Sequence, residues 1–151
     1  MNKYLLDTNI LLRTADVSSN SHTIANEAIN QIINDGNECV ITSQILIEFW
    51  VVATRSIDLN GLGWNTSQTK EYVNDLLDNF TLITENLDIF SNWLKLVTDH
   101  KIKGKRSHDI RILAVMISHN ITNLLTFNPK DFIQLPNIKI VHPQDIINNY
   151  S

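Results

Sequence analysis

Apolar residues concentrate in five short runs along the chain, and each run is closed by polar or turn-forming residues. Within the runs, leucine, isoleucine and valine often stand at consecutive positions, so a polar face is largely missing. Such runs are typical of strands that are buried on both sides in a parallel sheet. We therefore predict five strands, within the segments KYLL, ECVITS, FTLIT, NLLTF and IKIV.

The segments between these runs carry apolar residues at helical spacing. In residues 22–35, isoleucine and alanine recur on one face of a helix, and Gly36 follows as a helix-ending residue. The same reasoning predicts four further helices, over residues 44–55, 67–79, 87–101 and 108–119. Three polar residues near helix starts are expected to be N-caps, namely Ser43, Asn86 and Ser107.

The alternation of buried strands with helices predicts the fold class. Helices that connect parallel strands cover both faces of the sheet, so we expect an α/β protein with three layers, α/β/α, around a central parallel sheet. The chain has no linker rich in proline, glycine or serine, and residues 1–151 are therefore expected to form a single domain. In such sheets, ligands bind beyond the carboxyl ends of the strands, where the strand order reverses.

Four acidic residues lie at positions that this fold would bring toward a ligand. Asp7 directly follows KYLL, and Asp131 follows LLTF after a short turn. Glu48 lies in the strongly apolar segment SQILIEFWVV, and Asp109 lies in the first turn of a predicted helix. Each also has a purely structural explanation: Asp7 and Asp109 suit the positive end of a helix, Asp131 suits a turn, and Glu48 could be paired.

As a group, the four acids predict a cation site. Carboxylates gathered at one edge of a sheet repel one another and acquire raised pKa values unless a cation neutralises them. Oxygen ligands suit Mg²⁺ or Mn²⁺, whereas no spacing of histidine and cysteine indicates zinc. The net charge is −4, from 16 acidic and 12 basic residues, so the excess negative charge equals that of the proposed site.

The acidic balance also limits the partners of the protein, because it argues against binding nucleic acid through a global basic field. Lys103, Lys105 and Arg106 belong to a local basic cluster that could guide a phosphate backbone, although most such charge runs are a solvated helix end and loop. Apolar stretches are too short to cross a bilayer, which needs roughly 20 residues. We expect a soluble, cytoplasmic protein without membrane contact, in which Cys39 is a buried thiol.

Four sequence blocks resemble a known family. LLDTNILLR, SQILIEFW, HDIRILAVM and LLTFNPKDF occur in the order and approximate spacing of PIN domains, and the whole chain is similar to the VapC type of toxin ribonuclease. The resemblance implies that Asp7, Glu48, Asp109 and Asp131 surround Mg²⁺ or Mn²⁺ and cleave RNA. It also implies polar helpers, a homodimer and a small cognate antitoxin protein; the helpers would be Thr8, Asn9, Ser43, Thr126 and Asn128.

Two points remain open in this resemblance. Asn128 stands where some members of the family carry an aspartate, which leaves the fourth ligand undecided. The loop ATRSIDLNGLGWN is found in one subgroup; its Gly61, Gly63 and Trp64 either shape a substrate edge or fix a turn and cover the core, and we favour the latter.

The main functional alternative is a catalytically silent PIN-like scaffold that binds RNA or protein. Motifs of other enzyme classes are missing, including G-x-S-x-G, G-x-G-x-x-G and the Walker sequence. An aspartyl phosphatase would carry a second acid where Asn9 stands. Because all four acids are present, we favour a metal-dependent endoribonuclease over the scaffold.

Overall fold

Five strands are present in the computed structural model, which describes residues 1–149. They are β1 (Lys3–Leu6), β2 (Glu38–Thr42), β3 (Thr81–Ile83), β4 (Asn123–Leu125) and β5 (Lys139–Val141). The strands form one sheet in the order β3-β2-β1-β4-β5, and all four neighbouring pairs are parallel. Each strand falls within one of the predicted segments, so the prediction of a central parallel sheet is confirmed.

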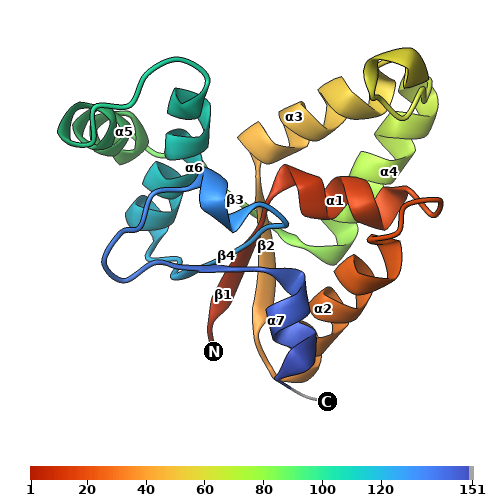
Figure 1. Ribbon diagram of the computed structural model, residues 1–151, viewed down its shortest axis with the longest axis horizontal. Coiled ribbons are helices and arrows are strands. Elements are labelled where there is room, and N and C mark those ends of the chain that lie inside the picture. Colours follow the sequence, from red (N-terminus) through yellow and green to blue (C-terminus); the bar gives the residue numbers. More distant parts are fainter. Residues whose placement is uncertain (150–151) are drawn as a thin grey trace.

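Helices cover both faces of the sheet and confirm the three-layer architecture (Figure 1). α5 and α6 lie on one side, whereas α1, α2 and α7 lie on the other. Two short 3-10 helices, η1 (Ile57–Leu59) and η2 (Pro129–Asp131), occur in connections. The α-helices of the described residues are α1 (Thr8–Ala15), α2 (His22–Asn34), α3 (Ser43–Thr54), α4 (Thr66–Asn79), α5 (Asp88–Asp99), α6 (Arg106–His119) and α7 (Pro143–Asn148).

The strand order reverses beside the central strand β1. From β1 the chain passes outward to β2 and β3, then returns through α5 and α6 to place β4 on the other side of β1. The register pairs Leu6 with Leu125, the last residues of β1 and β4. The next residue, Asp7, donates its backbone N–H to the Leu125 carbonyl at 3.0 Å. Segments from opposite ends of the sequence therefore meet at the switch point where ligands bind in such sheets.

A continuous apolar core fixes these ends in place. Leu5 and Leu6 of β1 are fully buried, as are Leu124 and Leu125 of β4. On one side of the sheet, α6 contributes the consecutive buried run 112–116. Because α6 is buried almost all round past its first turn, its amino-terminal end has little freedom to move relative to the sheet.

The structure corrects two of the predicted helix starts and qualifies the third. Thr42, not Ser43, caps α3, because the Thr42 hydroxyl accepts the N–H of Ile45 at 3.2 Å. Ser107 lies inside α6, which begins one residue earlier and has no side-chain cap bond. Asn86 does accept the N–H of Asp88 at 3.0 Å, although it stands one position before the cap of α5. Serine and threonine are both favourable N-caps, so where they stand at adjacent positions the backbone decides between them.

The loop between α3 and α4 packs as the favoured interpretation predicts. A Cβ atom at Gly61 would lie 2.0 Å from the Arg55 carbonyl oxygen, so only glycine fits this close approach. Trp64 then packs edge-on against Phe49 and Tyr72, with ring centroids 6.2 and 5.3 Å away. The loop therefore closes over the core. Within residues 1–149, none of the helices combines the length and apolar character that crossing a membrane requires.

Candidate active site

Asp7 lies at the centre of the candidate site, where β1 gives way to α1. It is the N-cap of α1, and its Oδ1 accepts the N–H of Thr8 at 2.8 Å. Its Oδ2 accepts the hydroxyl of Thr126 at 2.8 Å, from the residue that follows β4. The side chain is only 8% exposed. Both carboxylate oxygens are therefore held by residues that follow the two strands at the switch point, β1 and β4.

The surroundings of Asp7 disfavour its negative charge. The pKa of Asp7 is raised from 3.8 to about 6, mainly by burial and to a smaller extent by the nearby charges of Glu48 and Asp109. Hydrogen bonds from Thr126 and Thr8 offset part of this increase in pKa. A buried carboxylate that is opposed by other carboxylates is stabilised when a cation binds beside it.

Asn9 ties the start of α1 to the loop after β4. Its Nδ2 donates to the Thr126 hydroxyl at 3.1 Å and approaches Asp7 Oδ2 at 3.4 Å. Its Oδ1 accepts the backbone N–H of Phe127 at 3.1 Å. The backbone N–H of Asn128 also donates to the Thr126 hydroxyl, at 3.1 Å. Asn9 and Thr126 thus contact Asp7 directly, whereas Asn128 acts here through its backbone.

Glu48 projects from α3 and has one hydrogen-bond donor on each oxygen. The Thr8 hydroxyl donates to Oε2 at 2.9 Å, and the Gln44 amide donates to Oε1 at 3.0 Å. The side chain is half-buried, despite the apolar sequence around it. Thr8 therefore contacts two of the predicted acids, since its backbone binds Asp7 and its hydroxyl binds Glu48.

Asp109 and Asp131 are the other two predicted acids. Asp109 is half-buried in the first turn of α6, and burial raises its pKa. The charges of Glu48 and Asp131 raise the pKa of Asp109 further, whereas His108 and Arg106 lower it. Asp131 ends η2 and is exposed. The four acids predicted from the sequence therefore act on one another electrostatically, although they come from four different elements.

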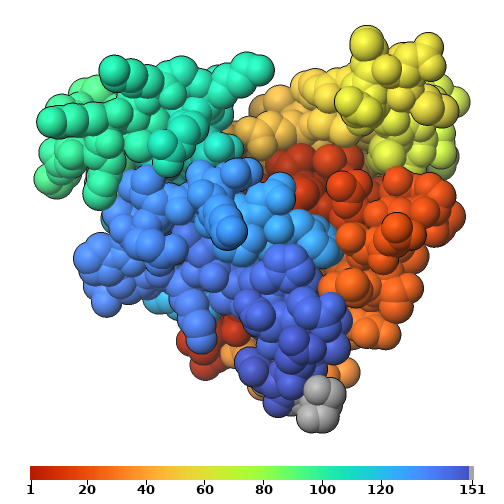
Figure 2. All heavy atoms as spheres, in the orientation of Figure 1, coloured from red at the N-terminus to blue at the C-terminus, as the bar shows by residue number. Residues whose placement is uncertain are grey.

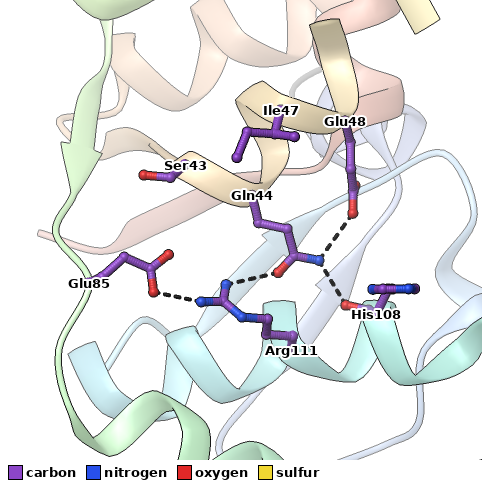
Figure 3. Close-up of a pocket in the computed structure, with 7 residues that line it drawn as sticks. All are labelled: Ser43, Gln44, Ile47, Glu48, Glu85, His108 and Arg111. Atoms are coloured by element: carbon purple, nitrogen blue, oxygen red, sulfur yellow. Dashed lines mark hydrogen bonds and ion pairs between the residues drawn. The ribbon is translucent and has the colours of Figure 1, made fainter. Parts of the chain in front are cut away.

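A pocket of about 460 Å³ opens beside Glu48 between α3 and α6 (Figure 3). Three of its polar residues were not predicted from the sequence: Gln44, Glu85 and Arg111. Arg111 donates to the Gln44 amide oxygen at 3.1 Å and to Glu85 at 2.6 Å. One signal in the sequence points to Gln44, because it stands four positions before Glu48 on the same helix. The remaining lining residues are Ser43, Ile47, Glu48 and His108.

Comparison with known proteins identifies the family of this chain. The PIN domain matches residues 4–138, a range that includes all four acids. The chain belongs to the PIN-domain family. This confirms the family resemblance that the four sequence blocks indicate, whereas no curated protein matches the chain significantly.

Solved structures share the fold at low sequence identity. A chain of the VapBC2 complex from Rickettsia felis, bound to a promoter DNA fragment, is 22% identical, with a TM-score of 0.68 and coverage of 93% of this chain and 98% of that chain. A chain of a toxin–antitoxin complex from Klebsiella pneumoniae is 25% identical, with a TM-score of 0.65 and coverage of 93% of this chain and 97% of that chain. The VapC20 toxin of Mycobacterium tuberculosis, which cleaves the sarcin–ricin loop, is 14% identical, with a TM-score of 0.59 and coverage of 80% of this chain and 86% of that chain.

The donor set of this PIN domain suits a hard divalent cation. All four acids offer oxygen atoms, the ligands that Mg²⁺ and Mn²⁺ prefer. Within residues 1–149, no three side chains of histidine, cysteine, aspartate or glutamate already stand close enough to hold a metal ion. The raised pKa values of Asp7 and Asp109 reflect the burial and mutual repulsion that a cation would relieve.

The remaining predicted residues lie around this cluster. Ser43 lines the pocket beside Gln44. Lys103 and Lys105 are exposed on the connection that leads into α6, and Arg106 is the first residue of that helix. Figure 2 shows this connection and α5 in one lobe, which a notch separates from the lobe that contains α3 and the loop between α3 and α4.

Proposed function

We propose that this PIN-domain protein is a divalent-metal-dependent endoribonuclease and the toxin of a type II toxin–antitoxin pair. The observation that carries the proposal is the buried carboxylate of Asp7 at the switch point, with the charges of Glu48 and Asp109 acting on it. An N-cap role accounts for the bond from the Thr8 N–H but leaves the burial of this charge without a basic partner. Within residues 1–149, the hydrogen-bond donors to the Asp7 carboxylate are neutral groups of Thr8, Asn9 and Thr126.

Asp7, Glu48 and Asp109 would hold Mg²⁺ or Mn²⁺ directly or through water, and Asp131 would contribute through water. When bound, the cation supplies an activated water and offsets negative charge on the scissile phosphate. The residues of the chain itself orient this centre. Thr126 and the Thr8 N–H fix the two oxygens of Asp7, and the Thr8 hydroxyl sets the position of Glu48 relative to Asp7.

RNA is the proposed substrate. An acidic protein needs local cationic groups to approach a phosphodiester, and Lys103, Lys105 and Arg106 offer such groups close in sequence to Asp109. The ability of the structurally similar VapC20 to cleave the sarcin–ricin loop supports RNA over DNA as the first substrate to test.

A small antitoxin protein and a second copy of the chain are the proposed partners. Support for the antitoxin comes from the complexes in which similar chains were solved, VapBC2 of Rickettsia felis and the toxin–antitoxin complex of Klebsiella pneumoniae, whereas the homodimer is proposed from the family resemblance.

A cleavage assay on total RNA tests the proposed activity. The wild-type protein should cut RNA with Mg²⁺ or Mn²⁺ and lose this activity in EDTA. Asp7→Asn should fold, bind RNA and cut at least a hundredfold more slowly, whereas the exposed helix acid Asp145 can be changed to asparagine without effect. Full cleavage in EDTA would remove the metal from the mechanism. Binding of RNA without cleavage by the wild-type protein would favour the catalytically silent scaffold.

A further inference from the structure

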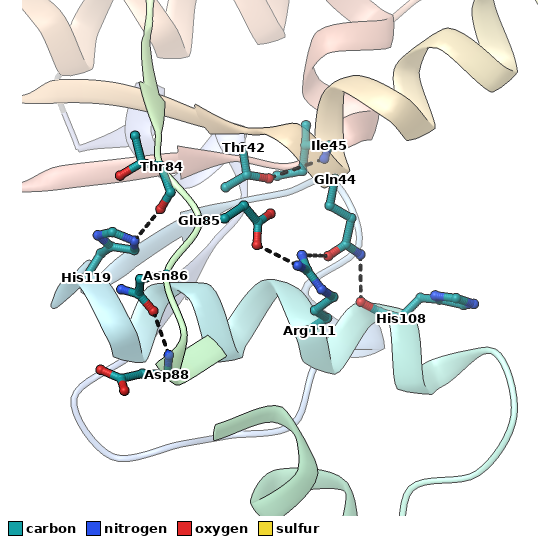
Figure 4. A network of polar contacts seen from close by, with 10 residues as sticks. All are labelled: Thr42, Gln44, Ile45, Thr84, Glu85, Asn86, Asp88, His108, Arg111 and His119. Atoms are coloured by element: carbon teal, nitrogen blue, oxygen red, sulfur yellow. Dashed lines mark hydrogen bonds and ion pairs between the residues drawn. The ribbon is translucent and has the colours of Figure 1, made fainter. Parts of the chain in front are cut away.

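We propose that Gln44 is a positioning residue for the metal centre, and that Arg111 acts through Gln44 by fixing the orientation of its amide. This inference rests on the proposed function, because it concerns how Glu48 is held for a cation. Figure 3 shows the Gln44 side chain of α3 in contact with Glu48, His108 and Arg111, and Figure 4 shows how the contacts continue from Arg111 to Glu85.

The hydrogen bonds of Gln44 form a directed chain. Its Nε2 donates to Glu48 Oε1 at 3.0 Å and to the backbone carbonyl of His108 at 2.9 Å. Its Oε1 accepts from Arg111 Nη1 at 3.1 Å. A guanidinium group can only donate, so the amide oxygen must face Arg111 and the NH₂ group must face Glu48. Arg111 therefore reinforces the amide orientation that the two acceptors, the Glu48 carboxylate and the His108 carbonyl, also require.

The second bond of Gln44 connects two of the acids. His108, whose carbonyl accepts this bond, directly precedes Asp109 on α6. One amide group thus bridges the Glu48 carboxylate on α3 and the backbone beside Asp109 on α6. Glu48 and Asp109 would bind the same cation. By linking α3 to α6, Gln44 would therefore help to set the distance between these two ligands.

The outer end of the network is anchored on the loop after β3. Arg111 Nη2 donates to Glu85 at 2.6 Å, and the adjacent carbonyl of Thr84 accepts from His119 Nε2 at 2.7 Å. Arg111 and Glu85 are 34% and 43% exposed, so this ion pair adds little to folding stability. The value of the network is geometric: it fixes Arg111, which orients Gln44, which in turn holds Glu48.

The test measures Mn²⁺ binding to the RNA-free protein by titration calorimetry and by the electron paramagnetic resonance of free Mn²⁺. Gln44→Met keeps the length of the side chain but removes its hydrogen bonds, and should weaken Mn²⁺ binding by about tenfold to a hundredfold. Gln31→Met is the matched control, because Gln31 also donates to an acid four positions away, Asp35, at 3.0 Å on a distant surface.

A second variant tests whether Arg111 acts through Gln44. Arg111→Lys keeps the charge but loses the planar fork, and should weaken Mn²⁺ binding several-fold. If Arg111 acts through Gln44, the same change should have no further effect when Gln44→Met is already present. Arg111→Met should also weaken Mn²⁺ binding if Arg111 acts through Gln44. If its role were purely electrostatic, Arg111→Met would instead strengthen Mn²⁺ binding, because a positive charge is removed.

The outcomes separate this inference from the proposed function. Equal Mn²⁺ affinity in Gln44→Met and Gln31→Met, with wild-type affinity in both, would overturn the positioning role and leave the nuclease proposal intact. Additive effects of the Gln44 and Arg111 changes would overturn the claim that Arg111 acts through Gln44. A wild-type protein that binds no Mn²⁺ would overturn the proposed function, and this inference with it. Urea unfolding without metal confirms that each variant is folded.

Discussion

The hydroxyl of Thr8 donates to Glu48 at 2.9 Å across a sequence separation of 40 residues. The backbone N–H of the same threonine donates to Asp7 at 2.8 Å. Thr8 therefore links the Asp7 carboxylate, which follows β1, to the Glu48 carboxylate on α3. The position of the first two acids depends on a neutral side chain that would not itself bind the metal.

Replacing Thr8 with valine should weaken Mn²⁺ binding about tenfold, because valine has the same shape but cannot donate to Glu48. Thr8→Ser retains the hydroxyl and should bind Mn²⁺ nearly as well as the wild-type protein. Thr98→Val, on the exposed face of α5, serves as the control for a lost threonine hydroxyl. Equal affinities in Thr8→Val and Thr8→Ser would show that the bond to Glu48 has no role in holding the cation.

The raised pKa of Asp7 predicts that the metal-free protein loses stability as the pH rises. The folded state holds the Asp7 proton up to about pH 6, whereas an unfolded aspartate releases it near pH 3.8. The contribution of Asp7 to stability is therefore full below about pH 4 and is lost as the pH rises through 6. By this linkage, Asp7→Asn should raise the free energy of unfolding at pH 7.5 by up to about 3 kcal/mol.

Urea unfolding of the metal-free protein between pH 4 and pH 8 measures this effect. The difference between Asp7→Asn and wild type should shrink toward pH 4, and added Mg²⁺ should stabilise the wild-type protein more than the variant at pH 7.5. Asp145→Asn should follow the wild-type curve throughout. A variant that is less stable than wild type at pH 7.5 would indicate that Asp7 stabilises the fold.

Asp131 should affect the Mg²⁺ requirement less than Asp7 does. Asp131 is exposed at the end of η2, whereas Asp7 is buried at the switch point. Asp131→Asn should therefore raise the Mg²⁺ concentration for half-maximal cleavage by a smaller factor than Asp7→Asn. If Asp131 only closes the turn, its replacement will lower the melting temperature without changing the Mg²⁺ requirement, and the residue then lies outside the metal site.

Expression without an antitoxin should arrest bacterial growth if the protein is a toxin. Asp109→Asn should abolish the arrest, since it removes one charge from the proposed centre with almost no change in shape. Asp88→Asn is the matched control, because Asp88 also lies in the first turn of a helix but is exposed on α5. Equal toxicity of the Asp109→Asn variant and the wild type would point to aggregation or protein binding as the cause.

The sequence predicted the sheet and the position of Asp7 for one physical reason. Strands buried on both faces have a strong apolar signature, and the residues that follow parallel strands must lie at one edge of the sheet. Asp7 could be placed this way from KYLL alone. Family resemblance was needed for Asp131, which follows β4 only after five intervening residues, from Thr126 to Lys130.

The Gln44 and Arg111 network could not be predicted in the same way. Which helices pack together depends on the tertiary fold, and the bond between Gln44 and Arg111 spans 67 positions. Arg111 lies in the apolar segment DIRILAVM, where a basic residue is equally compatible with a solvent-facing position. The helix α7 was also missed, because its six residues are too short to display a helical period.

The hydrogen bond between Thr126 and Asp7 joins residues 119 positions apart, and it determines when the site can form during synthesis. The ribosome must synthesise β4 before that strand can pair with β1 and complete the carboxylate cluster. Until then Asp7 lacks the Thr126 hydroxyl, and Asp109 belongs to a helix that has no completed sheet to pack on. On the proposed function, a toxin with this topology stays inactive toward the RNA of its own ribosome until translation has passed most of its message.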